Sequence, residues 1–125
     1  MVTLEQVEAA VERHAPMLVP GWAIGAKLHE FEDWNDDDVL CAPGRADISM
    51  ACERFLAAIR VDPRTSPVVL EELVCHELAH CLCYEYDWFV MNSIDRIHAD
   101  TQKRLTERLA WAIADLYLAA RKRGE

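Results

Sequence analysis

Two histidines four residues apart, with a glutamate directly after the first, constrain this chain more than any other feature. Residues 76–80 read His-Glu-Leu-Ala-His. Positions four residues apart on an α-helix lie about 40° apart around its axis, so the imidazoles of His76 and His80 would point to one side. Two imidazoles placed in this way can bind one tetrahedral zinc ion, and Glu77 is placed to contact a water molecule rather than the metal. The pattern predicts a zinc site in which Glu77 acts as the general base for hydrolysis.

The residues around this motif predict a buried helix. Residues 68–83 contain neither glycine nor proline, and Ser66 and Pro67 are suited to the N-cap and the first helical position. Apolar residues then cover most of the helix surface: Val69, Leu70, Leu73, Val74, Leu78 and Leu82. A helix that is apolar nearly all round belongs in the interior, where imidazoles and a carboxylate need partners. A metal ion would satisfy all three groups, whereas the alternative is two core histidines hydrogen-bonded to the backbone.

Length and charge limit the classes of protein to which the chain can belong. Its 125 residues fit a single domain, 1–125, that can bury a core without disulfides. The formal net charge of −9 argues against nucleic-acid binding through a basic surface. The basic residues 121–123 are expected to complement the dipole of a C-terminal helix.

Cysteine usage and hydropathy predict a cytoplasmic protein. No segment approaches the roughly 20 apolar residues that a membrane-spanning helix needs, and residues 1–8 lack the regions of a signal peptide. The five cysteines are odd in number and have no spacing typical of a disulfide framework. Reduced thiols and no membrane association are therefore expected.

The order of the expected elements predicts an α+β fold. Helices are expected at 3–14 (ended by Pro16 and Pro20), 52–60 and 100–121, strands at 22–31, 39–41 and 46–50, and irregular structure at 87–98. The last helix carries an apolar stripe of Leu105, Leu109, Ile113, Leu116 and Ala120. The sequence thus predicts a short antiparallel or mixed sheet of two to three strands, packed against the motif helix and a long C-terminal helix.

A third zinc ligand must come from outside the motif helix, because catalytic zinc sites take three protein ligands and leave one position open. A histidine six residues after His80 is absent, since Tyr86 stands there. Glu107 is favoured because it is the first residue of a helix face that is otherwise apolar and rich in alanine. Two alternatives stay open: His98 is the third ligand instead of Glu107, or Glu107 is a surface residue paired with neighbouring cations. His98 could also donate a hydrogen bond to an oxyanion.

Three further groups have two interpretations each. Cys83 falls on the helix face of both motif histidines and could bind the metal, although a small buried apolar residue is the alternative. Glu72, one turn before His76, could accept a hydrogen bond from its imidazole or lie exposed. His14 and His29 have no ligand-like neighbours in the sequence and are expected to be structural or surface residues.

The motif and its surroundings resemble the zincin metallopeptidases, and within them the gluzincins. Residues 74–80, Val-Cys-His-Glu-Leu-Ala-His, resemble their active-site helix, and residues 107–110, Glu-Arg-Leu-Ala, resemble the helix that carries their third ligand, a glutamate. The size and element order are similar to minimal gluzincin-like proteins and to short metallopeptidase-like proteins of bacteria and their phages. SprT-like peptidases are also similar, but their third-histidine motif is absent, which favours glutamate. The resemblance covers roughly residues 46–118.

The resemblance implies a zincin-like fold and a cytoplasmic zinc metallopeptidase acting on a peptide or protein substrate. Zinc would be held by His76, His80 and Glu107, with Glu77 as general base, and a short edge strand near 46–50 would bind an extended peptide. The alternative is a zinc-binding regulatory or interaction module with little or no peptidase activity, in which Cys83 or the C-terminal segment closes the site. Substrate, cleavage specificity and oligomeric state do not follow from the sequence.

Overall fold

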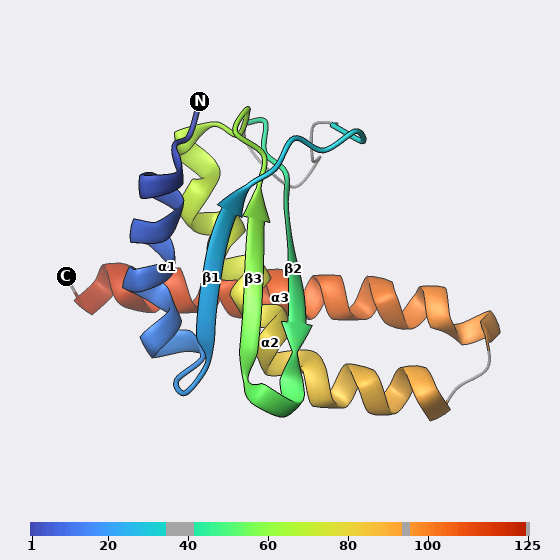
Figure 1. The fold of residues 1–125 in the computed structure, drawn as a ribbon. Helices are drawn as coiled ribbons and strands as arrows, with labels where there is room; N and C mark the ends of the chain where they lie inside the picture. The colour runs from blue at the N-terminus through green and yellow to red at the C-terminus, as the bar shows by residue number, and fades with distance from the viewer. Residues whose placement is uncertain (35–41, 94–95, 125) are drawn as a thin grey trace.

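A three-stranded sheet with α-helices on one face forms the protein (Figure 1). The structure is a computed structural model that describes residues 1–34, 42–93 and 96–124, with the side chains of residues 52 and 85–99 outside the description. Its elements, in order, are α1 (Leu4–Leu18), β1 (Ala23–Leu28), β2 (Ala46–Ala51), a 3-10 turn (Cys52–Arg54), β3 (Leu56–Val61), a second 3-10 turn (Pro67–Val69), α2 (Leu70–Ser93) and α3 (Arg96–Gly124). The predicted α+β class, with its long C-terminal helix, is confirmed. The strand predicted at 39–41 lies outside the described residues.

β3 is the central strand of a mixed sheet. It pairs in parallel with β1, with Ala23 opposite Leu56, and antiparallel with β2, with Ala46 opposite Val61. The helix predicted at 52–60 is therefore wrong beyond the single turn at Cys52–Arg54. Its residues alternate in burial: Ala57, Ile59 and Val61 are buried and the residues between them are not, which is the period of a strand.

The first helix begins as predicted and ends later. Thr3 accepts a hydrogen bond from the Gln6 backbone, and the Gln6 side chain accepts one from the Thr3 backbone, which together form a capping box. The prediction that Pro16 ends the helix is wrong, because α1 continues to Leu18. Pro16 lies in the last turn, where its missing N–H removes a single backbone hydrogen bond.

α2 begins at the predicted cap and runs ten residues past the predicted end of the motif helix. The Ser66 hydroxyl accepts a hydrogen bond from the Val68 backbone, and the first turn is 3-10 before the α-helix starts. The irregular structure predicted at 87–98 is wrong for residues 87–93 and 96–98, which belong to α2 and α3, and residues 94–95 lie outside the described residues. No glycine or proline occurs between Pro67 and Gly124, which favours long helices in this part of the chain. The two helices form a hairpin that extends beyond the sheet (Figure 1).

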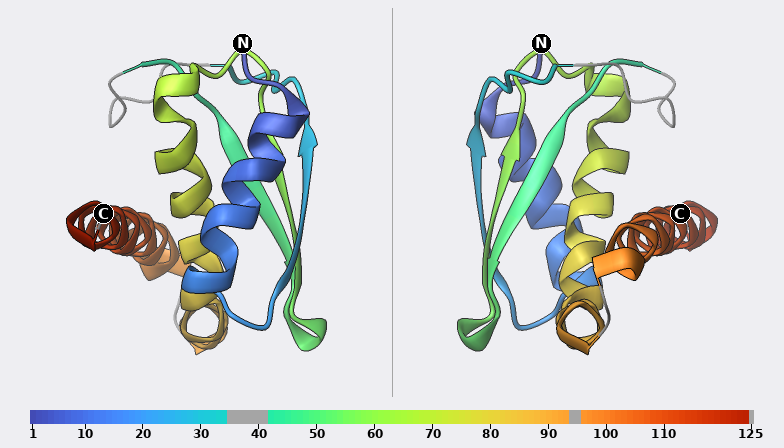
Figure 2. Two further views of the ribbon diagram at one scale, coloured as in Figure 1. Left: turned by 90° about the vertical axis from the view of Figure 1, so that its left-hand side faces the viewer. Right: turned by 90° about the vertical axis from the view of Figure 1, so that its right-hand side faces the viewer.

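The helices are arranged in two layers over the sheet (Figure 2). α1 packs on β1, α2 packs on β2, and α3 packs on α2 on the side away from the sheet. The core side chains lie between the sheet and the first layer, and include Val7, Val11, Ile59, Val61, Val74 and Leu78. Within the described residues, no helix combines the length and the apolar content needed to cross a membrane.

α3 does not bury the apolar stripe that its sequence suggests. The side chains it buries are Thr106, Ala110 and Ala114, whereas Leu105, Leu109 and Leu116 are 51%, 46% and 69% exposed. Small alanines on the buried face let α3 approach α2 closely, because the distance between packed helices depends on the side chains at the contact. This close approach brings Glu107 and Trp111 to the motif helix.

Candidate metal centre

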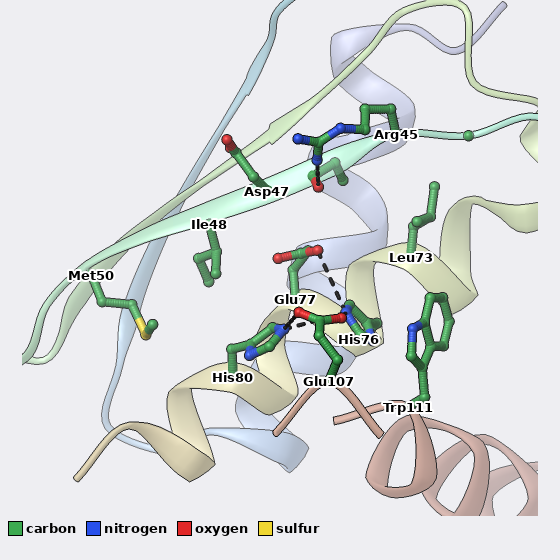
Figure 3. A pocket seen from close by; sticks show the side chains of 12 residues that line it. Arg45, Asp47, Ile48, Met50, Leu73, His76, Glu77, His80, Glu107 and Trp111 are labelled. Carbon is green, nitrogen blue, oxygen red and sulfur yellow. Dashed lines mark hydrogen bonds and ion pairs between the residues drawn. The ribbon is translucent and has the colours of Figure 1, made fainter. Parts of the chain in front are cut away.

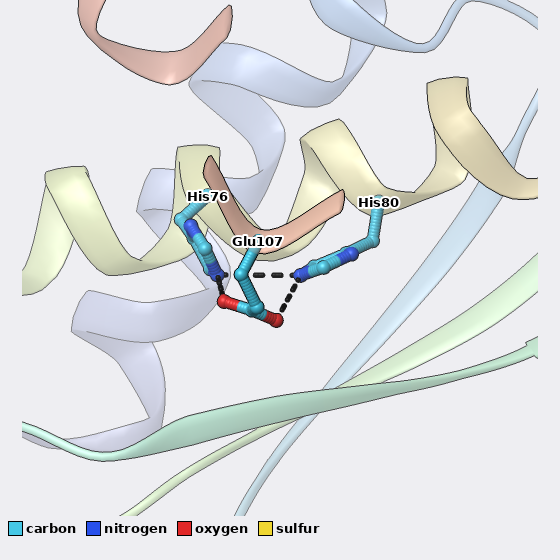
Figure 4. Close-up of side chains that lie close together, drawn as sticks. All are labelled: His76, His80 and Glu107. Atoms are coloured by element: carbon cyan, nitrogen blue, oxygen red, sulfur yellow. Dashed lines mark hydrogen bonds and ion pairs between the residues drawn. The ribbon is translucent and has the colours of Figure 1, made fainter. Parts of the chain in front are cut away.

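The two motif histidines project from α2 into a cleft between α2, β2 and α3 (Figure 3). His76 and His80 lie one helical turn apart, and their Nε2 atoms are 3.2 Å from each other. Glu107 reaches the same point from α3, with one carboxylate oxygen 2.9 Å from Nε2 of His76 and the other 3.0 Å from Nε2 of His80 (Figure 4). The structure thus brings together the three side chains that the sequence suggests as ligands.

The spacing and chemistry of these donor atoms fit a zinc ion. With zinc–ligand bonds of about 2.0–2.1 Å, the ligand atoms of a tetrahedral site lie about 3.3 Å apart. The two Nε2 atoms lie 3.2 Å apart, close to that value, and each lies 2.9 or 3.0 Å from a different oxygen of the Glu107 carboxylate. Two imidazole nitrogens and one carboxylate are also the donors that zinc prefers, whereas calcium and magnesium favour oxygen alone. Three protein ligands leave one tetrahedral position for water or substrate.

Glu107 is held in its charged form by the two imidazoles. Hydrogen bonds from His76 and His80 keep the pKa of the Glu107 carboxyl well below its ordinary range, and they outweigh the effect of its partial burial. No cationic side chain among the described residues forms an ion pair with it, so the alternative of a surface pair with Lys or Arg does not describe this glutamate. An ionised carboxylate is the form that binds a metal.

The ring of His76 is held by an indole. The Trp111 ring lies 3.9 Å from the His76 ring, centroid to centroid, with the planes inclined by 35°. Nδ1 of His76 is buried and has no hydrogen-bond partner among the described residues. Of the two interpretations of Glu72, the hydrogen bond to this imidazole is therefore not formed, and Glu72 lines a different cleft beside α1. Packing against Trp111 takes the orienting role that an acceptor usually has at metal-binding histidines.

Glu77 is buried beside the three converging side chains. Its carboxylate lies between them and β2, with one oxygen 3.9 Å from Nε2 of His76 (Figure 3). Burial is the main reason that the pKa of Glu77 is raised to about 8; the nearby carboxylates of Glu107 and Asp47 act in the same direction, against the opposing charges of His80 and Arg45. A cation bound among the three ligands would favour the ionised form instead.

The cleft has a volume of about 340 Å³ and an edge strand for one wall. β2 is at the edge of the sheet, so the backbone groups on its outer side are not used by another described strand. Ile48 and Met50 line the cleft from this strand, and Leu73 and Trp111 line it from the helices. Sequence reasoning missed the roles of Leu73 and Trp111 here. The available signal for Trp111 was its position four residues after Glu107, on the same helix face.

Two other candidate ligands, His98 and Cys83, were suggested by the sequence. The side chain of His98 lies outside the described residues. Cys83 is buried, but its thiol does not belong to the group of described donor atoms that lie within 4.8 Å of one another. Arg121 and Lys122, near the C-terminal end, line the cleft beside α1 and not the one at His76. The described residues therefore do not support a site closed by Cys83 or by the C-terminal helix end.

His14 belongs to a separate polar cluster, as expected for a structural residue. Its Nδ1 lies 2.9 Å from the Tyr117 hydroxyl and its Nε2 lies 3.3 Å from the Glu71 carboxylate, which also pairs with Arg13. Burial lowers the pKa of His14. This cluster connects α1, α2 and α3 and places no second imidazole beside the first.

Comparisons with known proteins do not assign a family or a function to this chain. No family model, curated protein or solved structure matches the chain. The function is therefore argued from the residues of the cleft.

Proposed function

We propose that the protein is a zinc-dependent metallopeptidase that hydrolyses bonds in a peptide or protein substrate, with the ligand set of a gluzincin. The observation that carries the proposal is the convergence of two Nε2 atoms and one carboxylate within 3.2 Å, from two different helices. Glu77, the residue directly after the first ligand, is buried at the same point. This set contains a metal-binding group and a separate general base, which are the two parts that hydrolysis requires.

The chemistry divides between the metal and the protein. A zinc ion at this site would lower the pKa of a water molecule and polarise a substrate carbonyl. His76, His80 and Glu107 would hold that ion. Glu77, buried beside them, would take the proton from the attacking water and give it to the leaving amine. The buried surroundings of Glu77 exclude bulk water, which strengthens the electrostatic interactions on which these transfers depend.

The edge of β2 supports a peptide as the substrate. An extended peptide could add to the free edge of this strand and would then run along the cleft past Glu77. Ile48 and Met50 would contact side chains of such a peptide. We place this activity in the cytoplasm, where the thiols of Cys75, Cys81 and Cys83, which form no disulfide, would stay reduced.

Metal content and activity of four variants test this function. Purified wild type is expected to bind one zinc ion per chain, and His80→Ala and Glu107→Ala are expected to lose it. Glu77→Gln should keep the zinc and lose peptidase activity, because only the proton acceptor is removed. Glu72→Gln is the matched control, since it changes a glutamate of the same helix outside the cleft, and it should keep both properties.

Three results would contradict parts of this proposal. Full activity of zinc-loaded Glu77→Gln would remove Glu77 as the base. Zinc retained by Glu107→Ala would move the third ligand to His98. No zinc in wild type, even after reconstitution, would leave the motif as part of a helical core.

A zinc-binding regulatory or interaction module is the second candidate. It is favoured by the small volume of the cleft and by the exposed apolar stripe of α3, which offers a surface for association. Such a module would bind zinc and show no hydrolysis of any peptide in a mixed library. An enzyme that processes one partner would also be inert on generic substrates. It would differ from the module by cleaving that partner in wild type and not in Glu77→Gln.

A further inference from the structure

α3 carries an apolar stripe on a side that no described residue covers. Leu105, Leu109, Ala112 and Leu116 are all exposed, and the three leucines retain 51%, 46% and 69% of their accessible surface. The spacings of four, three and four residues are those of the a and d positions in a coiled coil. α3 is the outer layer of the molecule (Figure 2), and its buried residues, Thr106, Ala110 and Ala114, lie on the other side of the helix from this stripe. Single exposed leucines are ordinary, but a continuous row on one helix indicates an interface.

Charged residues beside the stripe indicate which partner covers it. Arg108 and Asp115 are exposed, lie seven residues apart, and occupy equivalent positions on one flank of the stripe. Neither forms an ion pair within the described part of the chain. One flank therefore offers a cation and an anion that are both available to another molecule.

A second copy of the chain matches this pattern when the two α3 helices are antiparallel. With a twofold axis between Leu109 and Ala112, Leu105 of one copy meets Leu116 of the other, and Arg108 meets Asp115, each contact occurring twice. Ala112, beside the axis, is small and allows close approach. In a parallel pair, Arg108 and Asp115 would instead face Ile113 and Ala120 of the second copy, which carry no charge.

We propose that the protein is a twofold-symmetric dimer, formed by antiparallel packing of this stripe of α3, with Arg108 and Asp115 of the two copies paired across the interface. The dimer does not depend on the proposed peptidase activity. The opposite side of the same helix carries Glu107 and Trp111, so the interface would stabilise the helix that supplies part of the metal centre.

The mass in solution, measured by light scattering over a range of protein concentrations, tests the dimer. Wild type is expected at the dimer mass, and Leu109→Glu and Leu116→Glu at the monomer mass, with an unchanged circular dichroism spectrum and unchanged zinc content. Leu82→Glu is the matched control, because Leu82 is also 51% exposed but lies on α2. This variant should remain a dimer.

A charge exchange tests the orientation of the two helices. Arg108→Asp is expected to raise the dimer dissociation constant by roughly tenfold or more, because it places two carboxylates together at each pair. The double variant Arg108→Asp with Asp115→Arg should restore the wild-type constant. These surface substitutions keep the test valid if a leucine variant fails to fold.

Each other outcome overturns the proposal. A wild type that stays monomeric at every concentration would rule out the dimer, and the stripe would then bind a different protein. A dimer that survives both leucine variants would use another surface. A double variant that stays as weak as Arg108→Asp would rule out the antiparallel arrangement.

Discussion

Two polar clusters join α2 to α3, and they differ in how their histidines are satisfied. Around His14, one ring nitrogen lies 2.9 Å from the Tyr117 hydroxyl and the other lies 3.3 Å from the Glu71 carboxylate, so both nitrogens have partners. Around His76, two Nε2 atoms only 3.2 Å apart share the carboxylate of Glu107. Nδ1 of His76 has no partner within the described residues.

The first cluster is complete as a set of hydrogen bonds, whereas the second has donor atoms directed at one point. A metal ion would bind both Nε2 atoms and the Glu107 carboxylate at once, so these three groups would share one partner. A buried histidine therefore indicates a metal site only when other donor atoms converge with it, and His14 shows the alternative in the same molecule.

Removing one histidine from each cluster should give the largest difference between the two clusters. His80→Ala is expected to lower zinc affinity by roughly two to three orders of magnitude, because few ligands share the binding free energy of a zinc site. His14→Ala should keep the zinc affinity and lower the free energy of unfolding by about 2–3 kcal/mol, since a fully buried side chain and both its hydrogen bonds are lost. Competition with a chelator measures the first effect and denaturant unfolding measures the second. Equal losses of zinc in both variants would mean that the clusters are not distinct in function.

Asp62 is a third buried polar group, and all the hydrogen-bond donors to its carboxylate come from the protein. The Asp62 carboxylate accepts hydrogen bonds from the Phe31 backbone and from the backbone and guanidinium of Arg64. The Arg64 guanidinium is the main reason that the pKa of Asp62 is lowered to about 2, against the opposing effect of burial.

Acid should therefore weaken the fold through Asp62. Because its folded pKa lies below the ordinary value of 3.8, the stabilisation is complete above about pH 4 and is lost as the pH falls towards 2. The stabilisation by ionised Asp62 amounts to about 2 kcal/mol. Its loss appears as a slope in the free energy of unfolding, measured by denaturant over that pH range. Asp62→Asn should be less stable at neutral pH and should show a smaller slope. An unchanged slope in this variant would assign the acid response to other carboxylates.

The smallest effect is expected at Trp111. Trp111→Ala should weaken zinc binding about tenfold, the lower end of the range for residues that orient metal-binding histidines, because the His76 ring loses the indole against which it packs. Trp111→Phe should restore most of the affinity. Tyr117→Phe is the control on the same helix, because it alters the His14 cluster and should leave zinc binding unchanged. Zinc titration measures the affinity, and the absorption spectrum of the cobalt-substituted protein reports the arrangement of the ligands. Equal affinities of Trp111→Ala and wild type would show that the indole does not orient the His76 ring.

The local parts of the site could be predicted from the sequence, and the tertiary parts could not. The spacing of His76 and His80 determines their common direction as soon as the segment is helical, and Glu107 was recognisable as a carboxylate on an apolar helix face. The stacking of Trp111 on His76 depends on how two helices cross, which no local pattern contains. For the same reason, the sequence left two interpretations of Glu72 open, and the structure excludes the hydrogen bond from His76.

The fold shows the same division. The start of the first helix at residue 3 and the helix start at Ser66 depend on local caps and were predicted correctly. β3 was predicted as a helix, because its alanines favour helix and its alternation becomes decisive only when β1 and β2 pair with it. In α3, the leucines were more prominent than the alanines, yet the alanines form the packed face because they permit a close helix–helix contact.

The parallel and antiparallel partners of β3 bear on the order in which the chain folds. β2 and β3 are joined by a short connection through Phe55, which has a left-handed backbone, so this hairpin can form between near neighbours. β1 reaches β3 only after the whole intervening segment has closed into a loop, at a greater cost in chain entropy. The hairpin should therefore be an early structure, and the arrival of β1 with α1 a later and slower step. Because β2 already forms one wall of the cleft, the wall would be present before the sheet is complete.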